Sequence, residues 1–112
     1  MLMERLQVNY ADTDYEVHFH EYVDGNVAIY LHGTTDADAF MPATTNIGYT
    51  QLPENSVIVD HWEDLAFALF KGGVIDEPLG TLTSGFNNYG VFRLTDRAIN
   101  QMTIEFEEQA NV

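Results

Sequence analysis

The chain of 112 residues contains no cysteine. Disulfides, Cys-ligated zinc, iron–sulfur clusters and a thiol nucleophile are therefore excluded, and stability has to come from packing. No apolar run is long enough to span a bilayer. The first residues, with an acid already at Glu4, do not resemble a signal peptide. We therefore expect a cytoplasmic protein without a membrane role.

Basic residues are also scarce. Four Lys and Arg stand against 18 Asp and Glu, which gives a formal net charge of −14. Such a chain repels nucleic acid and anionic lipid surfaces, so we expect no direct nucleic-acid binding. The acids extend from Glu4 to Glu108 without forming a tail. They are therefore expected on a folded surface, where a basic protein is the natural partner.

Apolar residues are plentiful by comparison. They make up 46% of the chain and include seven Phe and six Tyr. That supply is enough for one ordinary core, and the length predicts a single domain over residues 1–112. The oligomeric state stays open.

The clearest local pattern is a β-hairpin. Odd-numbered apolar residues alternate over 16–23 and 27–32, and the intervening Asp24-Gly25-Asn26 is typical of a turn. Pairing Val23 with Val27 leaves a three-residue loop, with Asn26 expected to be left-handed, and places both apolar sets on one side of the sheet.

Further strands are predicted at 6–10, at 40–45 with an interruption at Pro42, at 57–59 and at 89–94. Residues 61–73 are typical of a helix with Asp60 as its N-cap, a buried stripe and a glycine end. The stripe consists of Trp62, Leu65, Ala66 and Leu69.

The C-terminal segment fits two structures. A helix over 96–103, capped by Thr95, places Ile99, Met102 and Phe106 on one face, whereas Met102, Ile104 and Phe106 also alternate as in a strand. We favour the helix. The whole pattern predicts an α+β fold, an antiparallel β-sheet with one or two helices packed on one face.

A histidine cluster is the first candidate site. His18 and His20 share one face of the hairpin, and the register above places His32 directly across from His18, with Glu16 nearby. Three imidazoles and a carboxylate suit zinc or another divalent transition metal. The alternative is that these side chains occupy a half-buried polar face beside Tyr22 and Tyr30.

A catalytic site is not indicated. The run His61-Trp62-Glu63-Asp64 holds a potential general base, but acids at a helix start also suit the helix dipole, and no paired nucleophile is evident. We therefore expect a protein that is not an enzyme.

The acids themselves are the second candidate site. Carboxylates that stand where DNA phosphates would stand can compete for a basic, nucleic-acid-binding cleft. The residues predicted to bind such a partner are Asp12, Asp14, Glu16, Asp36, Asp38, Asp60, Glu63, Asp64, Asp76 and Glu77. The alternatives are plain acidic solubility, or a subunit that assembles through the aromatics Tyr22, Tyr30 and Phe86.

Several short motifs resemble a family of small acidic proteins without an assigned function. They are Tyr22 to Ile29, Thr44-Thr45-Asn46 followed by Leu52-Pro53, Gly73 to Pro78 with Gly80, Ser84-Gly85-Phe86 and Val91 to Leu94. The family is encoded by bacteria, prophages and conjugative elements. The resemblance implies an accessory protein of a phage or mobile element, such as a counter-defence inhibitor. The chain departs from the family in its extra acids and in His18, His20 and His32.

Overall fold

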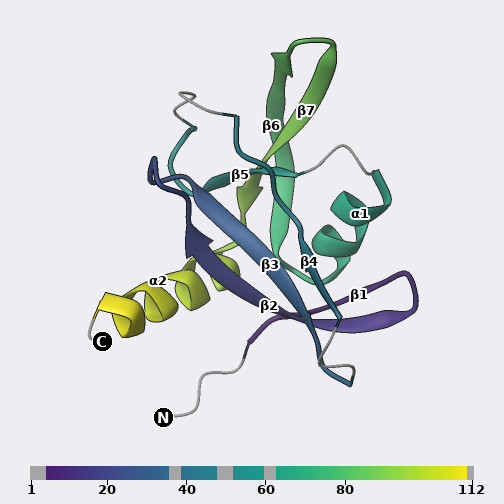
Figure 1. The fold of residues 1–112 in the computed structure, drawn as a ribbon, viewed down its shortest axis with the longest axis vertical. Coiled ribbons are helices and arrows are strands. Elements are labelled where there is room, and N and C mark those ends of the chain that lie inside the picture. Colours follow the sequence, from purple (N-terminus) through teal and green to yellow (C-terminus); the bar gives the residue numbers. More distant parts are fainter. Residues whose placement is uncertain (1–4, 36–38, 48–51, 60–62, 111–112) are drawn as a thin grey trace.

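The computed structural model describes residues 5–35, 39–47, 52–59 and 63–110. Within these ranges the chain forms seven strands and two helices (Figure 1). In chain order they are β1 (Gln7–Tyr10), β2 (Thr13–Glu21), β3 (Val27–Gly33), β4 (Phe40–Pro42), β5 (Ser56–Val59), α1 (Glu63–Lys71), β6 (Ile75–Ser84), β7 (Asn87–Leu94) and α2 (Asp96–Ala110).

The strands form two antiparallel sheets. The first has the order β1-β2-β3-β4 and the second the order β5-β7-β6. The α+β class is thus confirmed, with the predicted antiparallel strands divided between two sheets. Thr44, which follows β4, forms an isolated bridge with Val59 of β5 and so joins the two sheets. Neither helix, as far as its residues are described, is long and apolar enough to cross a membrane.

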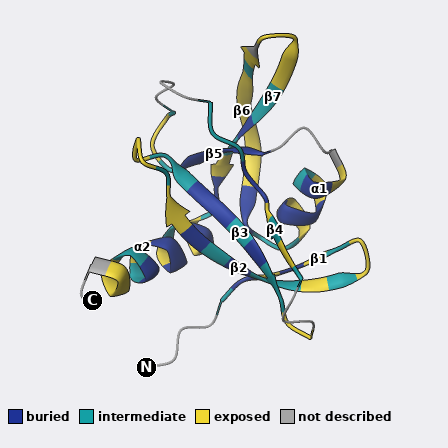
Figure 2. Ribbon diagram, viewed as in Figure 1, coloured by how far each residue is buried: buried dark blue, intermediate teal, exposed yellow. Residues whose placement is uncertain are grey.

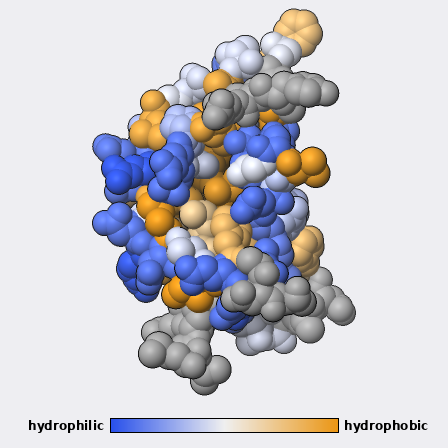
Figure 3. Space-filling view, turned by 90° about the vertical axis from the view of Figure 1, so that its left-hand side faces the viewer, coloured by the Kyte–Doolittle hydropathy of each residue, from blue (hydrophilic) through white to orange (hydrophobic). Residues whose placement is uncertain are grey.

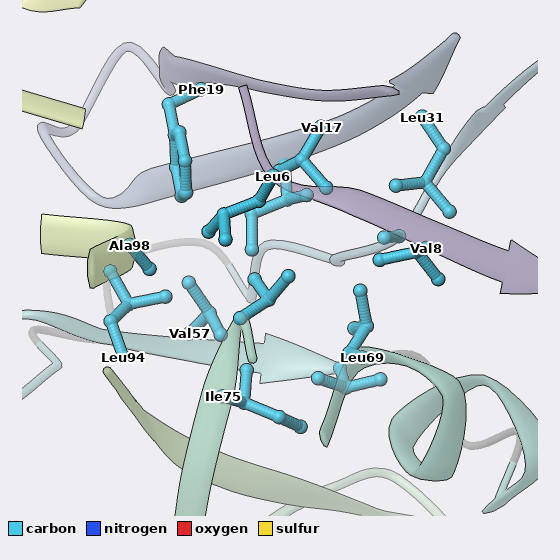
Figure 4. Close-up of a cluster of buried hydrophobic side chains, with 14 of the residues drawn as sticks. Leu6, Val8, Val17, Phe19, Leu31, Val57, Leu69, Ile75, Leu94 and Ala98 are labelled. Carbon is cyan, nitrogen blue, oxygen red and sulfur yellow. The ribbon is translucent and has the colours of Figure 1, made fainter. Parts of the chain in front are cut away.

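The core lies between the two sheets and the helices (Figure 4). Val17 and Phe19 of β2 point toward Val57 of β5 and Leu94 of β7, and all four side chains are fully buried. The helix α1 packs against β1 and β6, and α2 packs against β2. The outer part of the β6–β7 hairpin extends away from this core and is exposed (Figure 2).

The hairpin formed by β2 and β3 has the predicted faces within its strands but a different register, and Val23, predicted on the apolar face, is fully exposed in the loop. Val27 pairs with Glu21, not with Val23. The connecting loop is longer than predicted, and its left-handed residue is Gly25, with φ 90°, instead of Asn26. The loop closes with two backbone hydrogen bonds, Tyr22 N–H to Asn26 O (2.8 Å) and Gly25 N–H to Tyr22 O (2.9 Å).

The helix α1 is described from Glu63 to Lys71. The predicted N-cap Asp60 and the stripe residue Trp62 lie outside the described residues. The burial of Leu65 and Leu69 confirms these two stripe residues, whereas Ala66 is only half-buried. The helix ends at the predicted glycines. Gly72 has a second role, because a Cβ there would lie 2.8 Å from the backbone oxygen of Gln7 in β1.

The strand β6 was not among the predicted strands. It is the edge strand of the second sheet and pairs with β7 along most of its length, with irregularities at Pro78 and Gly80. An edge position accommodates Pro78, which has no N–H to donate.

The C-terminal segment is a helix to Ala110, so the strand alternative is wrong and the predicted end at residue 103 is too early. The predicted cap is confirmed. The Thr95 hydroxyl oxygen accepts a bond from the Ala98 N–H (3.1 Å) and its O–H donates to the Gly73 carbonyl (2.6 Å). The cap therefore also ties the start of α2 to the end of α1.

Candidate functional site

The predicted partner-binding acids separate into three groups. Asp36, Asp38 and Asp60 lie outside the described residues, and Glu63 is described only as the first residue of α1. Glu16 and Asp14 lie on the histidine side of β2, because alternate residues of a strand share a face. The other four acids lie around α1, and they are Asp12, Asp64, Asp76 and Glu77.

The β1–β2 turn lies beside α1. A hollow of about 380 Å³ is lined by Tyr10 and Ala11 from the turn region and by Asp64, Phe67 and Lys71 from the helix. The exposed Asp12 follows Ala11 directly in this turn. The carboxylates of the turn and of the first turn of α1 therefore belong to one continuous surface.

A second hollow, of about 520 Å³, lies between α1 and the start of β6. We call it the α1–β6 hollow, and its lining is Ala66, Phe67, Phe70, Ile75, Asp76, Glu77, Pro78 and Phe92. Phe67 lines both hollows, so the two adjoin. We use the name α1 face for the surface formed by Asp12, Asp64, Phe67, Phe70, Asp76 and Glu77.

Among the described residues, the acids of the α1 face have no basic partner. Within the described ranges, every ion pair involves Glu16 or Glu105, with Arg5 or His18 as the cation. The one lysine near the α1 face is Lys71, whose Nζ lies 5.5 Å from the centre of the Phe67 ring. The negative charge of this face is therefore left for ions or for another molecule.

On the side of the molecule opposite the α1 face, an exposed acid, Asp24, is held by hydrogen bonds from its neighbours. Figure 3 shows the side that carries α2 and the β2–β3 loop, where hydrophilic side chains predominate and hydrophobic ones are visible between them. Asp24 in this loop is held by its neighbours. The side-chain amide of Asn46 donates to Asp24 Oδ2 (3.0 Å), and this bond, followed by the Asn26 backbone N–H, lowers the pKa of Asp24.

The histidines do not have the predicted pairing. His18 lies across from Tyr30, and His32 lies across from Glu16. The rings of His18 and His32 are nevertheless neighbours, with centroids 4.1 Å apart, because diagonal side chains on one face also meet. His20 instead contacts the Tyr30 ring edge-on at 5.2 Å.

His18 is held as a neutral imidazole. Burial, then the nearby His32 and Arg5 charges, lower the pKa of His18. The contact of its Nε2 with Glu16 Oε1 (3.0 Å) is therefore best described as a hydrogen bond donated by the neutral ring, although it has the geometry of an ion pair.

A metal at this cluster stays a prediction. All three histidines are described, and among described residues no group of three or more His, Asp or Glu side chains is placed to hold a metal ion. Two features of the metal hypothesis agree with this geometry, the contact of His18 with His32 and that of His18 with Glu16, whereas His20 contacts Tyr30. Tyr22 and Tyr30, expected as exposed interface aromatics, are half-buried, and the Tyr22 hydroxyl is bonded to Thr44 Oγ1 (2.9 Å).

Sequence reasoning missed a polar ladder on α2. Gln101, Glu105 and Gln109 follow one another at helical spacing, one turn apart. The Gln101 side-chain amide donates to Val17 O (2.8 Å), Glu105 Oε2 accepts from Phe19 N–H (2.7 Å), and the Gln109 side-chain amide donates to Phe19 O (3.3 Å). The signal was the regular spacing of three polar residues beside the apolar face of α2.

Comparison of the chain with models of known families, with curated proteins and with solved structures gives no significant match. The resemblance to proteins of mobile elements therefore stays a prediction from short motifs.

Proposed function

We propose that this chain is a non-enzymatic protein that binds a basic protein partner through the carboxylates of its α1 face. The single observation that carries the proposal is that Asp12, Asp64, Asp76 and Glu77 are exposed and have no basic partner among the described residues. Together with the net charge of −14, these acids attract a cationic surface and speed its approach.

The partner that this charge fits best is a protein that binds nucleic acid. A cleft that holds DNA or RNA is lined with Lys and Arg, and it gains affinity from the counterions released when charges pair. Carboxylates without a basic partner gain affinity for such a cleft from the same release of counterions. The chain therefore competes with the nucleic acid for the cleft. The role we infer is that of an accessory protein of a phage or mobile element that inhibits a nuclease or another defence protein of the host, in line with the resemblance of the short motifs.

The experiment compares two charge-neutralised variants as bait in a host lysate. The test variant removes carboxylates from the α1 face by Asp12→Asn, Asp64→Asn, Asp76→Asn and Glu77→Gln.

The control variant removes the same number of exposed carboxylates from elsewhere by Glu21→Gln, Glu54→Gln, Glu107→Gln and Glu108→Gln. Both variants have the same net charge, so a difference between them reports position and not total charge.

We expect the unchanged protein and the control variant to retain a basic protein that elutes between low and moderate salt and that double-stranded DNA displaces. The test variant is expected to lose it. Equal retention by the two variants, or partners that persist through high salt, would refute the proposal.

A further inference from the structure

The helix α1 is apolar on two sides. Leu65 and Leu69 are fully buried against the core, whereas Phe67 and Phe70 are 62% and 57% exposed. Residues three apart in a helix share a side, so the two Phe rings stand together on the outside. A helix that is apolar on both sides is usually covered on both sides.

These rings belong to a larger apolar surface. The α1–β6 hollow adds Pro78 and the half-buried ring of Phe92. Single exposed apolar residues are ordinary, but a contiguous group around a hollow of about 520 Å³ is typical of a surface that binds something.

The charge around the hollow selects the occupant. Asp76 and Glu77 line it, and Asp64 stands on the same helix, one turn before the exposed rings. A second copy of the chain, docked by two-fold symmetry, would bring these same acids face to face. A cationic partner gains from the same charges, and they supply its specificity and rate of association.

We propose that the α1–β6 hollow accepts an apolar anchor side chain of the partner, and that the partner segment is therefore amphipathic and basic, an aliphatic or aromatic residue flanked by Lys or Arg. The proposal rests on the proposed function and deepens it, because it adds a fixed point of attachment to an otherwise diffuse charge interaction. Burial of an anchor between Phe67 and Phe70 resembles the central contact that dominates many interfaces.

The experiment measures the affinity of two short synthetic peptides by calorimetry at low and moderate salt. One peptide is an amphipathic sequence of Lys and Leu, and the other has Ser in place of every Leu, so that the two have the same charge. The protein variants are Phe67→Ser with Phe70→Ser, and as control Phe86→Ser, which removes a fully exposed ring from the β6–β7 turn outside the hollow.

We expect the unchanged protein to bind the Leu peptide about tenfold more tightly than the Ser peptide, the effect of burying one large apolar side chain. The Phe67 and Phe70 variant should lose this preference while it still binds both peptides through charge. The Phe86 variant should keep it. In the unchanged protein, the amide resonances of α1 and of the start of β6 should shift when the Leu peptide binds.

The contrary outcomes distinguish failure of the anchor site from failure of the proposed function. A preference that survives in the Phe67 and Phe70 variant, resonance shifts confined to other elements, or a dimer that forms through these rings at moderate salt would refute the anchor site alone. Failure of the unchanged protein to bind either peptide at low salt would refute the proposed function, and the anchor site with it.

Discussion

The polar ladder on α2 predicts that the isosteric substitution Glu105→Gln lowers the stability of the fold substantially. This carboxylate is only 4% exposed, and it receives the Phe19 N–H (2.7 Å) on one oxygen and Arg5 Nε (3.0 Å) on the other. The Gln101 amide is also within 3.5 Å. Glu105→Gln preserves the shape and the helix propensity but replaces one acceptor oxygen by an N–H₂ donor, so a buried donor is left facing another donor.

The expected cost follows from these contacts. A hydrogen bond to a charged group contributes about 1.5–3 kcal/mol, and a buried donor left unsatisfied costs about 1–3 kcal/mol. We therefore expect Glu105→Gln to lower the free energy of unfolding by about 2 kcal/mol. In urea unfolding followed by circular dichroism, this shifts the midpoint by roughly 1 M.

The control is Glu107→Gln, which removes the same charge from an exposed position on the same helix. It should change stability by less than about 0.5 kcal/mol. The Phe19 amide should also exchange its hydrogen faster in the Glu105 variant. Equal midpoints for the two variants would refute the argument that the ladder is a set of required hydrogen bonds.

Other changes test separate parts of the fold. Burial and the neighbouring His32 lower the pKa of His18 from 6.5. The unfolded state then takes up the proton first, so stability should decline as pH falls below about 6.5, and an NMR titration midpoint for His18 at or above that value would contradict this. Thr95→Ala should lower the free energy of unfolding by about 1 kcal/mol through loss of the α2 cap, Thr95→Ser should retain most of it, and equal loss in both would argue against the cap. Gly72→Ala should lower the free energy of unfolding by about 1–3 kcal/mol, because its Cβ would lie 2.8 Å from the backbone oxygen of Gln7. Unchanged thermal stability would show that the end of α1 and β1 move apart easily.

The hairpin shows what a sequence pattern can and cannot specify. Alternation predicted the faces of β2 and β3 correctly, because a strand has a period of two. The register failed because the loop is set by distant contacts. The Tyr22 hydroxyl is bonded to Thr44, and Asp24 is bonded to Asn46, both from the segment after β4. A register shifted by two residues leaves every side chain on its face, so alternation alone could not reveal the error.

The strand β6 and the length of α2 were also beyond local reasoning. β6 contains Pro78 and Gly80 and has no buried alternation, and its strand structure depends on pairing with β7. The helix α2 continues to Ala110 since its polar residues find acceptors and donors on β2, a contact between segments far apart in the chain.

The sequence predicted the charge of the candidate site but not its position on the molecule or its apolar part. Charge counting indicated a basic partner, but it could not show that Asp64 and Asp76 lie on the same side of the molecule as the β1–β2 turn. The helical stripe of Leu65 and Leu69 accounted for one side of α1. Phe67 and Phe70 fall outside that stripe, and this surplus of apolar residues was the available signal of a second contact surface.

The position of α2 has a consequence for how this protein meets other sheets. β1 pairs with β2 as far as Glu16, and the Leu6 carbonyl just before β1 still accepts the Val17 N–H (2.9 Å). From there on, side chains of α2 bond the Val17 carbonyl and both backbone groups of Phe19. A strand from a neighbouring molecule cannot pair with these backbone groups of β2, because they are already bonded. It would first have to displace α2 before it could extend the sheet. The helix thus covers this part of the sheet edge, and a helix cannot pair with a further strand. This protects the molecule against the edge-to-edge strand pairing that leads to ordered aggregates.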